Sequence, residues 1–565
     1  MHIYLTDIHW GNDLKSCLGA LEDLNSGGAA IPELQKLSSI GTDGEWAGNT
    51  RRDLLTMLFP QIDLPSPLTI RVPYLPKDAS LSRVEYTDAA IFMPNEVFHC
   101  LYLHYPGLFM PFLGRGLCEF WEQIKRDDPV AHHHPVFRME EYKTKAVPLV
   151  ISGDKVRFTD EGETLHVLAW AGAHTTGLAW QKYFLLCVFP ASRCCKLKHH
   201  GIATMSVFWD FIKCGFEALS KGVHPELDPY GDPWPPASRQ ADLAGRKIAG
   251  GAFFGSFWGA SSDLEYAVTE WGVPHWSTPS PCLHCGAHRS DGRLNIRNVS
   301  MSAGWRKSWR PAEDRGTLGH PIWAIPGASS HAYRGDWMHT MEEGVMLYLH
   351  ASCFHDLLDG PFNRFQSIDL RVDSLWASLQ KHFSNNDKHL RRLTSKMVGG
   401  NDAVFPILSP CKAWESKSLI SPLLALLREV DCKEEHFLHL VRCYECLEFM
   451  FVIIDEPGLF LDDAASDNLW EAANEFLQEF DWLTKSSLER GQARYNPTFK
   501  LHWMMHICWS ARHLHPRSTW TYGFEDFCSR VKRLAISCMK ATPSHRLSSK
   551  IPAQYKVALH LVASR

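Results

Sequence analysis

Three acidic residues in separate segments of the chain have the type and spacing needed to bind divalent cations together. Asp154 ends the apolar run Ala146-Val-Pro-Leu-Val-Ile-Ser-Gly-Asp154, which the pattern predicts to be a buried central strand. Asp263 follows a second apolar run at 251–258, and Glu415 lies on a predicted helix. Carboxylates that converge from separate elements can hold two cations roughly 3.5–4 Å apart, which is the requirement for two-metal phosphoryl transfer.

Asp154 and Asp263 each have a structural interpretation as well. The sequence Ser152-Gly153-Asp154-Lys155 is also typical of a hairpin turn, because Gly and Asp are strong turn residues. Ser262 and Glu265 have the spacing of a capping box that opens a helix over 264–271, with Asp263 favourably placed in its first turn. Capping and metal ligation are compatible at a strand-to-helix junction, so both interpretations of Asp263 stay open.

The third carboxylate is expected on a helix that packs on the sheet, and Glu415 is the leading candidate. Leu419 and Leu423 stand four and eight residues after it, so the acid lies on the apolar stripe of its helix. Glutamates are rarely buried there without a partner, although a glutamate at the border of the stripe is the structural alternative. The rival candidates are Glu342, Glu343 and Glu429.

A cysteine pair predicts a second metal site of a different kind. Cys282-x-x-Cys285 has prolines and a glycine around it, the turn setting that lets two thiolates reach one zinc. His339, which stands with Asp336 in a D-x-x-H spacing, is a candidate to complete the site, and His284 and His288 are nearer in sequence. Unliganded core thiols are the alternative.

The elements around Asp154 follow a recognisable order. Two strand-like runs, 164–170 and 183–189, come after the first strand, and a helical pattern over 204–222 ends at a glycine. The strand candidate at 251–258 then leads into Asp263. Three strands, a helix and a fourth strand, with the two aspartates at the first and fourth strands, are the layout of an RNase H-like nuclease core.

Composition sets the class of protein and limits its partners. Of 565 residues, 45% are apolar and 21% are charged, which is typical of a globular chain, and 17 scattered cysteines do not resemble a disulfide framework. No run approaches the roughly 18–20 apolar residues of a membrane span, and no signal sequence is apparent, so we expect an intracellular protein without a membrane partner. The net charge of −5 means that any DNA must bind local basic surface, such as the segment after Asp526, which has no acidic residue.

The pattern divides the chain into a β-rich first half and a helical second half, an α/β + α fold class. We expect an N-terminal region at 1–140, the first part of a mixed five-stranded core at 141–280, and an insertion at 281–404. A closing catalytic helix at 405–430 and a helical C-terminal region at 431–565 follow. The helices of the second half are expected near 337–358, 371–382, 411–429, 433–453, 464–490, 498–513 and 523–540.

Read together, these segments resemble the DDE/D transposases of the CACTA-like superfamily and its Plavaka-type relatives. The strand Val147-Pro-Leu-Val-Ile-Ser-Gly-Asp154 matches the family's first aspartate, and Ser262-Asp263-Leu with Cys282-x-x-Cys285 matches its second aspartate and cysteine pair. Asp336-Trp-Met-His339-x-x-x-x-Gly344-Val matches the D-x-x-H-x-x-x-x-G-V segment, and Lys412-Ala-Trp-Glu415 resembles the closing acidic helix. The resemblance spans about half of the chain.

The resemblance implies a nuclear recombinase that cuts and joins DNA. Asp154, Asp263 and Glu415 would hold two Mg²⁺ or Mn²⁺ ions, one activating water or a DNA 3′-hydroxyl and the other stabilising the leaving oxygen. Cys282, Cys285 and His339 would bind a structural zinc. The implied partners are the DNA of the element ends and target, and further copies of the same chain.

Two other functions stay open at this point. One is a transposase-derived protein that binds DNA or protein without turnover, because residues 1–140 contain no recognisable module that reads element ends. The other is an RNase H-like nuclease that acts on RNA or hybrids, because the acidic residues do not identify the sugar.

Overall fold

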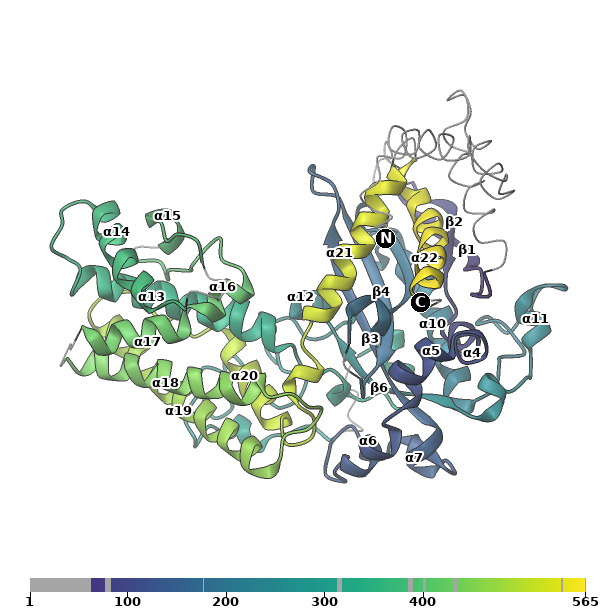
Figure 1. The fold of residues 1–565 in the computed structure, drawn as a ribbon, viewed down its shortest axis with the longest axis horizontal. Helices are drawn as coiled ribbons and strands as arrows, with labels where there is room; N and C mark the ends of the chain where they lie inside the picture. The colour runs from purple at the N-terminus through teal and green to yellow at the C-terminus, as the bar shows by residue number, and fades with distance from the viewer. Residues whose placement is uncertain are drawn as a thin grey trace, which may run out of the picture.

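A six-stranded mixed sheet forms the centre of one lobe of the molecule (Figure 1). The computed structural model describes residues 62–76, 83–175, 177–311, 318–384, 390–399, 403–430, 434–539 and 542–563, so much of the expected N-terminal region at 1–140 lies outside the described residues. The strands are β1 (Leu68–Tyr74), β2 (Glu85–Ile91), β3 (Ala146–Arg157), β4 (Thr164–Gly172), β5 (Phe184–Pro190) and β6 (Phe254–Ser261). Their order is β1-β2-β5-β4-β3-β6, and β3 and β6 are parallel whereas the other neighbours are antiparallel.

Helices cover both faces of this sheet, which explains why β3 is apolar along most of its length. Helix α10 (Thr204–Lys221) packs on β6, and its terminal Gly222 has the left-handed conformation of a helix stop, as the sequence predicts. The last two helices, α21 (Tyr522–Met539) and α22 (Leu547–Ala563), pack on β3 and on β5 with β2, respectively. In Figure 1 these two yellow helices lie across the sheet although they end the chain.

A second, all-helical lobe stands beside the sheet and has an apolar core of its own (Figure 1). Leu423, Leu440 and Phe480 are among its fully buried side chains. Its helices are α13 (Met346–Asp359), α14 (Ile368–Leu379), α16 (Ala413–Ser418), α17 (Ile420–Glu429), α18 (Glu435–Asp455), α19 (Asp463–Glu489) and α20 (Phe499–Ser510). Among the residues that the structure describes, no helix combines the length and apolar character needed to cross a membrane.

The predicted α/β + α class agrees with the structure, with differences in where two segments belong. The sheet has six strands instead of the predicted five: the four runs located in the sequence form β3 to β6, and β1 and β2 come from the N-terminal region, where β2 joins β5 through the pair Ile91 and Cys187. Segment 405–430 forms α16 and α17, which pack against α13, α14 and α18 in the helical lobe. An apolar stripe shows that a helix has a buried face but does not show which core receives it.

Candidate metal centres

Asp154 and Asp263 leave the same end of the parallel strand pair. Ser152 of β3 lies opposite Ser261 of β6, and each aspartate comes two residues later. Asp154 is itself paired with Val167 of β4, and β3 continues to Arg157, so the turn interpretation of this segment is wrong. Because neighbouring strands are about 4.7–4.9 Å apart, the register brings the two carboxylates to one edge of the sheet.

Gly153 serves close packing within β3. A Cβ atom at this position would lie 2.4 Å from the Cε1 atom of Tyr266, a buried residue of α12 (Leu264–Glu270). The glycine therefore lets α12 approach one face of the strand. Since successive side chains of a strand point to opposite faces, Asp154 points to the other face, where α21 packs.

Asp263 opens α12 as its N-cap residue. Its Oδ1 atom accepts a hydrogen bond from the Tyr266 backbone N–H at 2.6 Å. The expected capping box is therefore displaced by one residue, because Ser262 donates its hydroxyl to the Asp263 carbonyl instead of capping the helix. Capping fixes the orientation of the Asp263 carboxylate while its second oxygen can still bind a cation.

Glu525, in the first turn of α21, is the third carboxylate near these aspartates. Burial raises the pKa of Glu525 to about 7, and the charges of Glu343 and Asp154 contribute to the rise. Burial likewise raises the pKa of Asp154 to about 6, with a further contribution from Asp263. The charge of Asp263 therefore acts on Asp154, and the charge of Asp154 acts on Glu525; we name these three residues the acidic cluster. Crowded carboxylates with raised pKa values are typical of a site that receives a cation.

Glu415 lies in a different setting. Its Oε2 atom accepts a hydrogen bond from the Lys412 backbone N–H at 2.9 Å, so it caps the first turn of its own helix. It is not among the charges that act most on Asp154 or Glu525. Leu419 and Leu423 are buried as the stripe predicts, but in the core of the helical lobe.

The D-x-x-H segment joins the helical lobe to the start of α21. The Oδ2 atom of buried Asp336 accepts hydrogen bonds from His339 Nδ1 at 2.5 Å and from the Thr521 hydroxyl at 2.9 Å, and Oδ1 accepts from the Thr521 N–H at 3.0 Å. His339 Nε2 lies 3.3 Å from Glu525 Oε1. Burial alone would lower the pKa of His339, but the hydrogen bond and charge of Asp336, with Glu525 and Asp263, raise it to about 9.

Gly344 has a packing role in the same segment, which is a π-helix over Met338–Val345. The Lys500 ammonium donates hydrogen bonds to the backbone carbonyls of His339 at 2.6 Å and Glu343 at 3.0 Å. A Cβ atom on Gly344 would lie 2.4 Å from Lys500 Cδ. The glycine therefore gives Lys500 access to two carbonyls of the π-helix. Short π-helical segments are frequent at functional sites.

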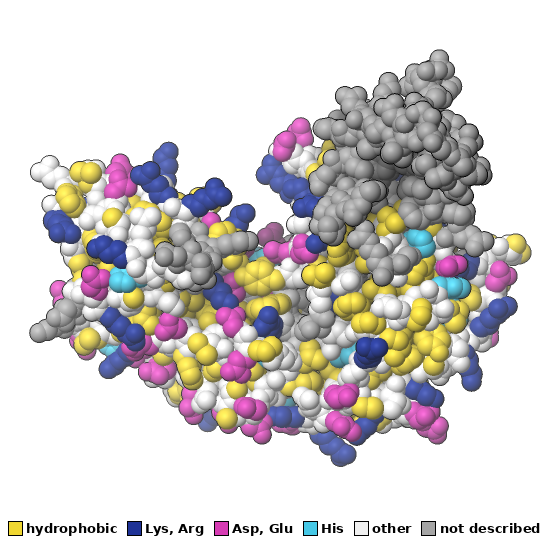
Figure 2. Space-filling model, viewed as in Figure 1, with side chains coloured by type: hydrophobic (Ala, Val, Ile, Leu, Met, Phe, Trp, Pro, Cys, Tyr) yellow, Lys and Arg dark blue, Asp and Glu magenta, His cyan; other side chains and the backbone are white. Residues whose placement is uncertain are grey.

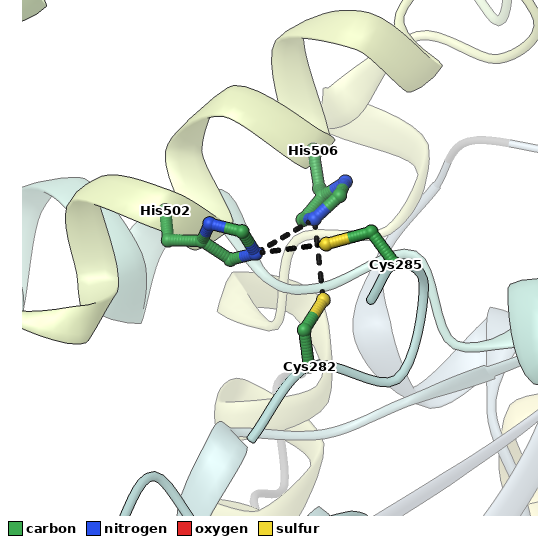
Figure 3. Close-up of side chains that lie close together, drawn as sticks. All are labelled: Cys282, Cys285, His502 and His506. Atoms are coloured by element: carbon green, nitrogen blue, oxygen red, sulfur yellow. Dashed lines mark hydrogen bonds between the residues drawn. The ribbon is translucent and has the colours of Figure 1, made fainter. Parts of the chain in front are cut away.

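Four buried side chains form a separate group, Cys282, Cys285, His502 and His506, whose ligand atoms lie within 4.8 Å of one another (Figure 3). The Sγ to Nε2 distances are 3.2 Å for Cys282 and His506 and 3.5 Å for Cys285 and His502, and the two Nε2 atoms are 2.9 Å apart. Around tetrahedral zinc, the usual bond lengths give edges of about 3.6 Å between S and N and about 3.3 Å between two N atoms. The group fits zinc with small adjustments.

The surroundings of the cysteines support a metal site. The His284 backbone N–H points at Cys282 Sγ at 3.3 Å, and Cys285 pairs with Trp309 in a short antiparallel bridge. Burial raises the pKa of the Cys285 thiol and the adjacent Cys282 raises it further. Burial would also raise the pKa of Cys282, but the hydrogen bond from Cys285 and the charges of His506 and His502 hold it well below its usual range, so a bound cation would favour the thiolate form of both cysteines.

Two of the three predicted zinc ligands therefore lie in this group. Cys282 and Cys285 belong to the group, whereas the histidines that complete it are His502 and His506, which stand four residues apart on one face of α20. His339 contacts Asp336 and Glu525 instead, and His284 Nε2 lies 2.8 Å from the Tyr333 carbonyl. His288 is likewise engaged elsewhere, since its Nδ1 accepts hydrogen bonds within its own loop.

The two groups are linked along the chain. Cys282 comes shortly after Asp263 in the sequence, and His506 comes shortly before Glu525. The Cys2His2 group thus ties together the points where the chain leaves the sheet after β6 and returns to it as α21. His502 and His506 were not among the ligands predicted from sequence, although the H-x-x-x-H spacing within 501–506 was a usable signal. Glu525 was not among the predicted acids.

Comparison with known proteins does not place the chain in a family. Neither a scan against protein-family models nor a search of curated proteins gave a match.

Proposed function

We propose that the chain is a transposase-type protein that cleaves and transfers DNA strands with metal ions held by Asp154, Asp263 and Glu525. The observation that carries the proposal is the parallel register that brings Asp154 and Asp263 to the same end of β3 and β6, with α21, which bears Glu525, packed on β3. In this proposal Glu525 takes the role that sequence reasoning gave to Glu415.

The sheet topology supports an RNase H-like core beneath this site. The strands β5, β4 and β3 are antiparallel neighbours in that order, and β6 then joins β3 as its parallel partner. Helix α10 connects β5 to β6, and α21 lies on β3 beside the carboxylates. In this layout the helical lobe is an insertion between the second and third acidic residues.

The chemistry of the donors fits Mg²⁺ or Mn²⁺. Carboxylate oxygens are the ligands that these hard cations prefer, and two bound ions would supply activation of an attacking oxygen and stabilisation of a leaving one. The chain itself fixes the donors: Asp263 is oriented by its cap bond to Tyr266, and Asp154 by its place within β3. The positive charge of His339 lowers the pKa of Glu525, which opposes the effect of burial and keeps the carboxylate available.

Basic side chains near the acidic cluster offer a path for DNA phosphates. Lys532 stands seven residues after Glu525, two turns along the same face of α21, and Arg533 is exposed next to it. Figure 2 shows a notch between the two lobes, with acidic side chains at its floor and Lys and Arg side chains on both walls. Cations on the walls would position the phosphate backbone while the acids remain free to bind metal.

We further propose that the Cys2His2 group binds one structural zinc ion. All four donors are buried and all are protein side chains, which is the composition of a closed site. Zinc there would hold the ends of the inserted lobe together and so set the position of α21. The geometry of the acidic cluster would then depend on the zinc, although the two metal sites have no ligand in common.

The proposal is tested with purified full-length protein, Mg²⁺ or Mn²⁺, and a supercoiled plasmid as a DNA substrate. We expect nicking or strand transfer that Glu525→Gln reduces by on the order of a thousandfold, because losing several kcal/mol of metal-mediated stabilisation costs tenfold per about 1.4 kcal/mol. Glu415→Gln is the matched control and should leave the rate within about threefold.

Three results would overturn the proposal. An equal loss of cleavage activity in Glu415→Gln and Glu525→Gln would contradict the assignment of Glu525 as the third metal-binding carboxylate. Cleavage restricted to an RNA–DNA hybrid would instead support an RNase H-like nuclease. Tight DNA binding with no cleavage under any metal condition would favour a protein that binds without turnover.

A further inference from the structure

A pocket of about 170 Å³ opens on the helical lobe beside the Cys2His2 group, and none of the three acidic residues lines it. Its walls come from three segments that are distant in sequence. Trp305 and Trp309 follow the cysteine pair, Trp470 belongs to α19, and Trp509 belongs to α20. The concentration of four indole rings around one opening is not needed to bind zinc, so the pocket requires its own explanation.

The rings form an aromatic wall in which two of them already stack on each other. Trp309 and Trp509 stack with their centroids 3.9 Å apart and their planes inclined by 30°. Trp305 is buried and bonded through its indole N–H to the Asn298 carbonyl, whereas Trp309, Trp470 and Trp509 are half-buried. Large aromatic rings left partly open to solvent around a concave site are typical of ligand binding.

The charges around the pocket select the kind of ligand. The Arg306 guanidinium lies over Trp305 and is engaged by Asn474 at 2.8 Å and by the Val299 carbonyl at 2.9 Å. Arg512 lies over Trp509, is 38% exposed, and has Asp467 no closer than 3.9 Å. Two guanidinium groups disfavour a cationic ligand and favour a planar ring that carries a phosphate.

We propose that this pocket binds an unpaired nucleobase of a single DNA strand, with the indole rings as its apolar wall and Arg512 at the neighbouring phosphate. Aromatic rings accept any base by its face, and arginine adds a phosphate contact, which is how single strands are held without sequence preference. The choice of DNA rests on the proposed function.

The position of the pocket relates it to the acidic cluster. Lys500, whose pKa is influenced by Asp336 and Asp263, lies at one end of α20, and Trp509 lies nine residues further along. Nine helical residues span about 14 Å. The pocket therefore lies about that far along α20 from Lys500.

The test measures equilibrium binding of a fluorescently labelled single-stranded DNA oligonucleotide and of its duplex to full-length protein carrying Asp154→Asn. We expect Trp309→Ala and Trp509→Ala each to weaken single-strand binding roughly five- to a hundredfold, with a smaller effect on the duplex. Trp276→Ala is the matched control, because Trp276 is also exposed and also lies under an arginine, Arg289. Zinc content verifies folding, since the Trp309 ring contacts His506.

Arg512→Gln provides a second variant that leaves the rings in place, and it should weaken single-strand binding and reduce its salt dependence. The proposal is overturned if the pocket variants bind like Trp276→Ala, if single strand and duplex lose affinity equally, or if RNA binds more tightly than DNA. Binding is measured without cleavage, so failure of the catalytic proposal and failure of this one give different results.

Discussion

The acidic cluster and the Cys2His2 group lie in one chain but differ in every property that decides what a metal does. Asp154, Asp263 and Glu525 are partly open to solvent, carry hard oxygen donors, and come from elements of the sheet and its covering helix. Cys282 and His506 belong to a group that is fully buried and offers sulfur and nitrogen. The first setting suits cations that are exchanged with substrate, and the second suits a zinc that stays.

The difference also appears in how each group affects the fold. Like charges at the acidic cluster oppose one another, so the metal-free site costs stability that a bound cation would restore. The Cys2His2 donors contact one another directly and join distant parts of the chain, so a zinc there would contribute to folding itself. The predictions below test this contrast.

The largest effect is expected from the Cys2His2 group. Cys282→Ser or His502→Gln should abolish binding of one zinc per chain and lower the melting temperature by at least about 10 °C, because structural zinc contributes on the order of 10 kcal/mol. Zinc is measured by elemental analysis and melting by circular dichroism. His339→Gln and His288→Gln are the controls and should retain the zinc; loss of zinc in His339→Gln would restore the ligand set expected from sequence.

A smaller effect is expected from Gly153→Ala. The added Cβ would meet the Tyr266 ring, and overpacking of this kind costs about 1–3 kcal/mol. Because the Tyr266 N–H also donates the cap bond to Asp263, the change should weaken metal-dependent activity together with stability. Gly292→Ala, in a loop where nothing lies within 4 Å of the added Cβ atom, is the control for lost glycine flexibility. Chemical denaturation measures the stability of both variants, and equal stability would argue against the close packing of α12 on β3.

The smallest effect concerns pH. Burial raises the pKa of Asp154 to about 6 and that of Glu525 to about 7, so the folded protein holds these protons more tightly than the unfolded chain. The free energy of unfolding of the magnesium-free protein should therefore fall as the pH rises from about 4 to about 7. Asp154→Asn should reduce this fall, by on the order of 1 kcal/mol, and should be more stable than the wild type at pH 8.

Added Mg²⁺ should reverse the order of stability of the wild type and Asp154→Asn at pH 8. It should raise the melting temperature of the wild type, since a ligand that binds only the folded state stabilises it, and should have little effect on Asp154→Asn. Asp160→Asn, exposed in the loop between β3 and β4, is the matched control. A magnesium response in Asp154→Asn equal to that of the wild type would place the cation elsewhere.

The sheet and the first two acids were within reach of sequence reasoning because they depend on local patterns. The apolar runs at Asp154 and Asp263 predicted β3 and β6, whereas the parallel register of these two strands appears only in the structure. Glu525 was out of reach because its significance arises only when α21 returns to β3 after the whole of the helical lobe. Glu415 had the stronger local pattern, because it lies on the apolar stripe of its helix, but that stripe packs into the core of the helical lobe.

The proposed zinc ligands show the same limit. Cys282 and Cys285 were found from their spacing, whereas their partners lie far along the chain on α20 and were not connected to them. His339 was a reasonable candidate by type, yet Asp336 and Glu525 occupy both of its ring nitrogens. Short-range spacing can mark each half of such a site, Cys-x-x-Cys and His-x-x-x-His, and the fold shows that the two halves belong together.

The most direct test of the acidic cluster is iron-mediated cleavage of the protein's own backbone. Fe²⁺ replaces Mg²⁺ in carboxylate sites, and with ascorbate and peroxide it generates radicals that cut the chain near the bound ion, without any DNA substrate. We expect fragments that end near Asp154, Asp263 and Glu525, suppressed by excess Mg²⁺ and absent in Glu525→Gln. Cuts near Glu415, or cuts unchanged in Glu525→Gln, would contradict the account.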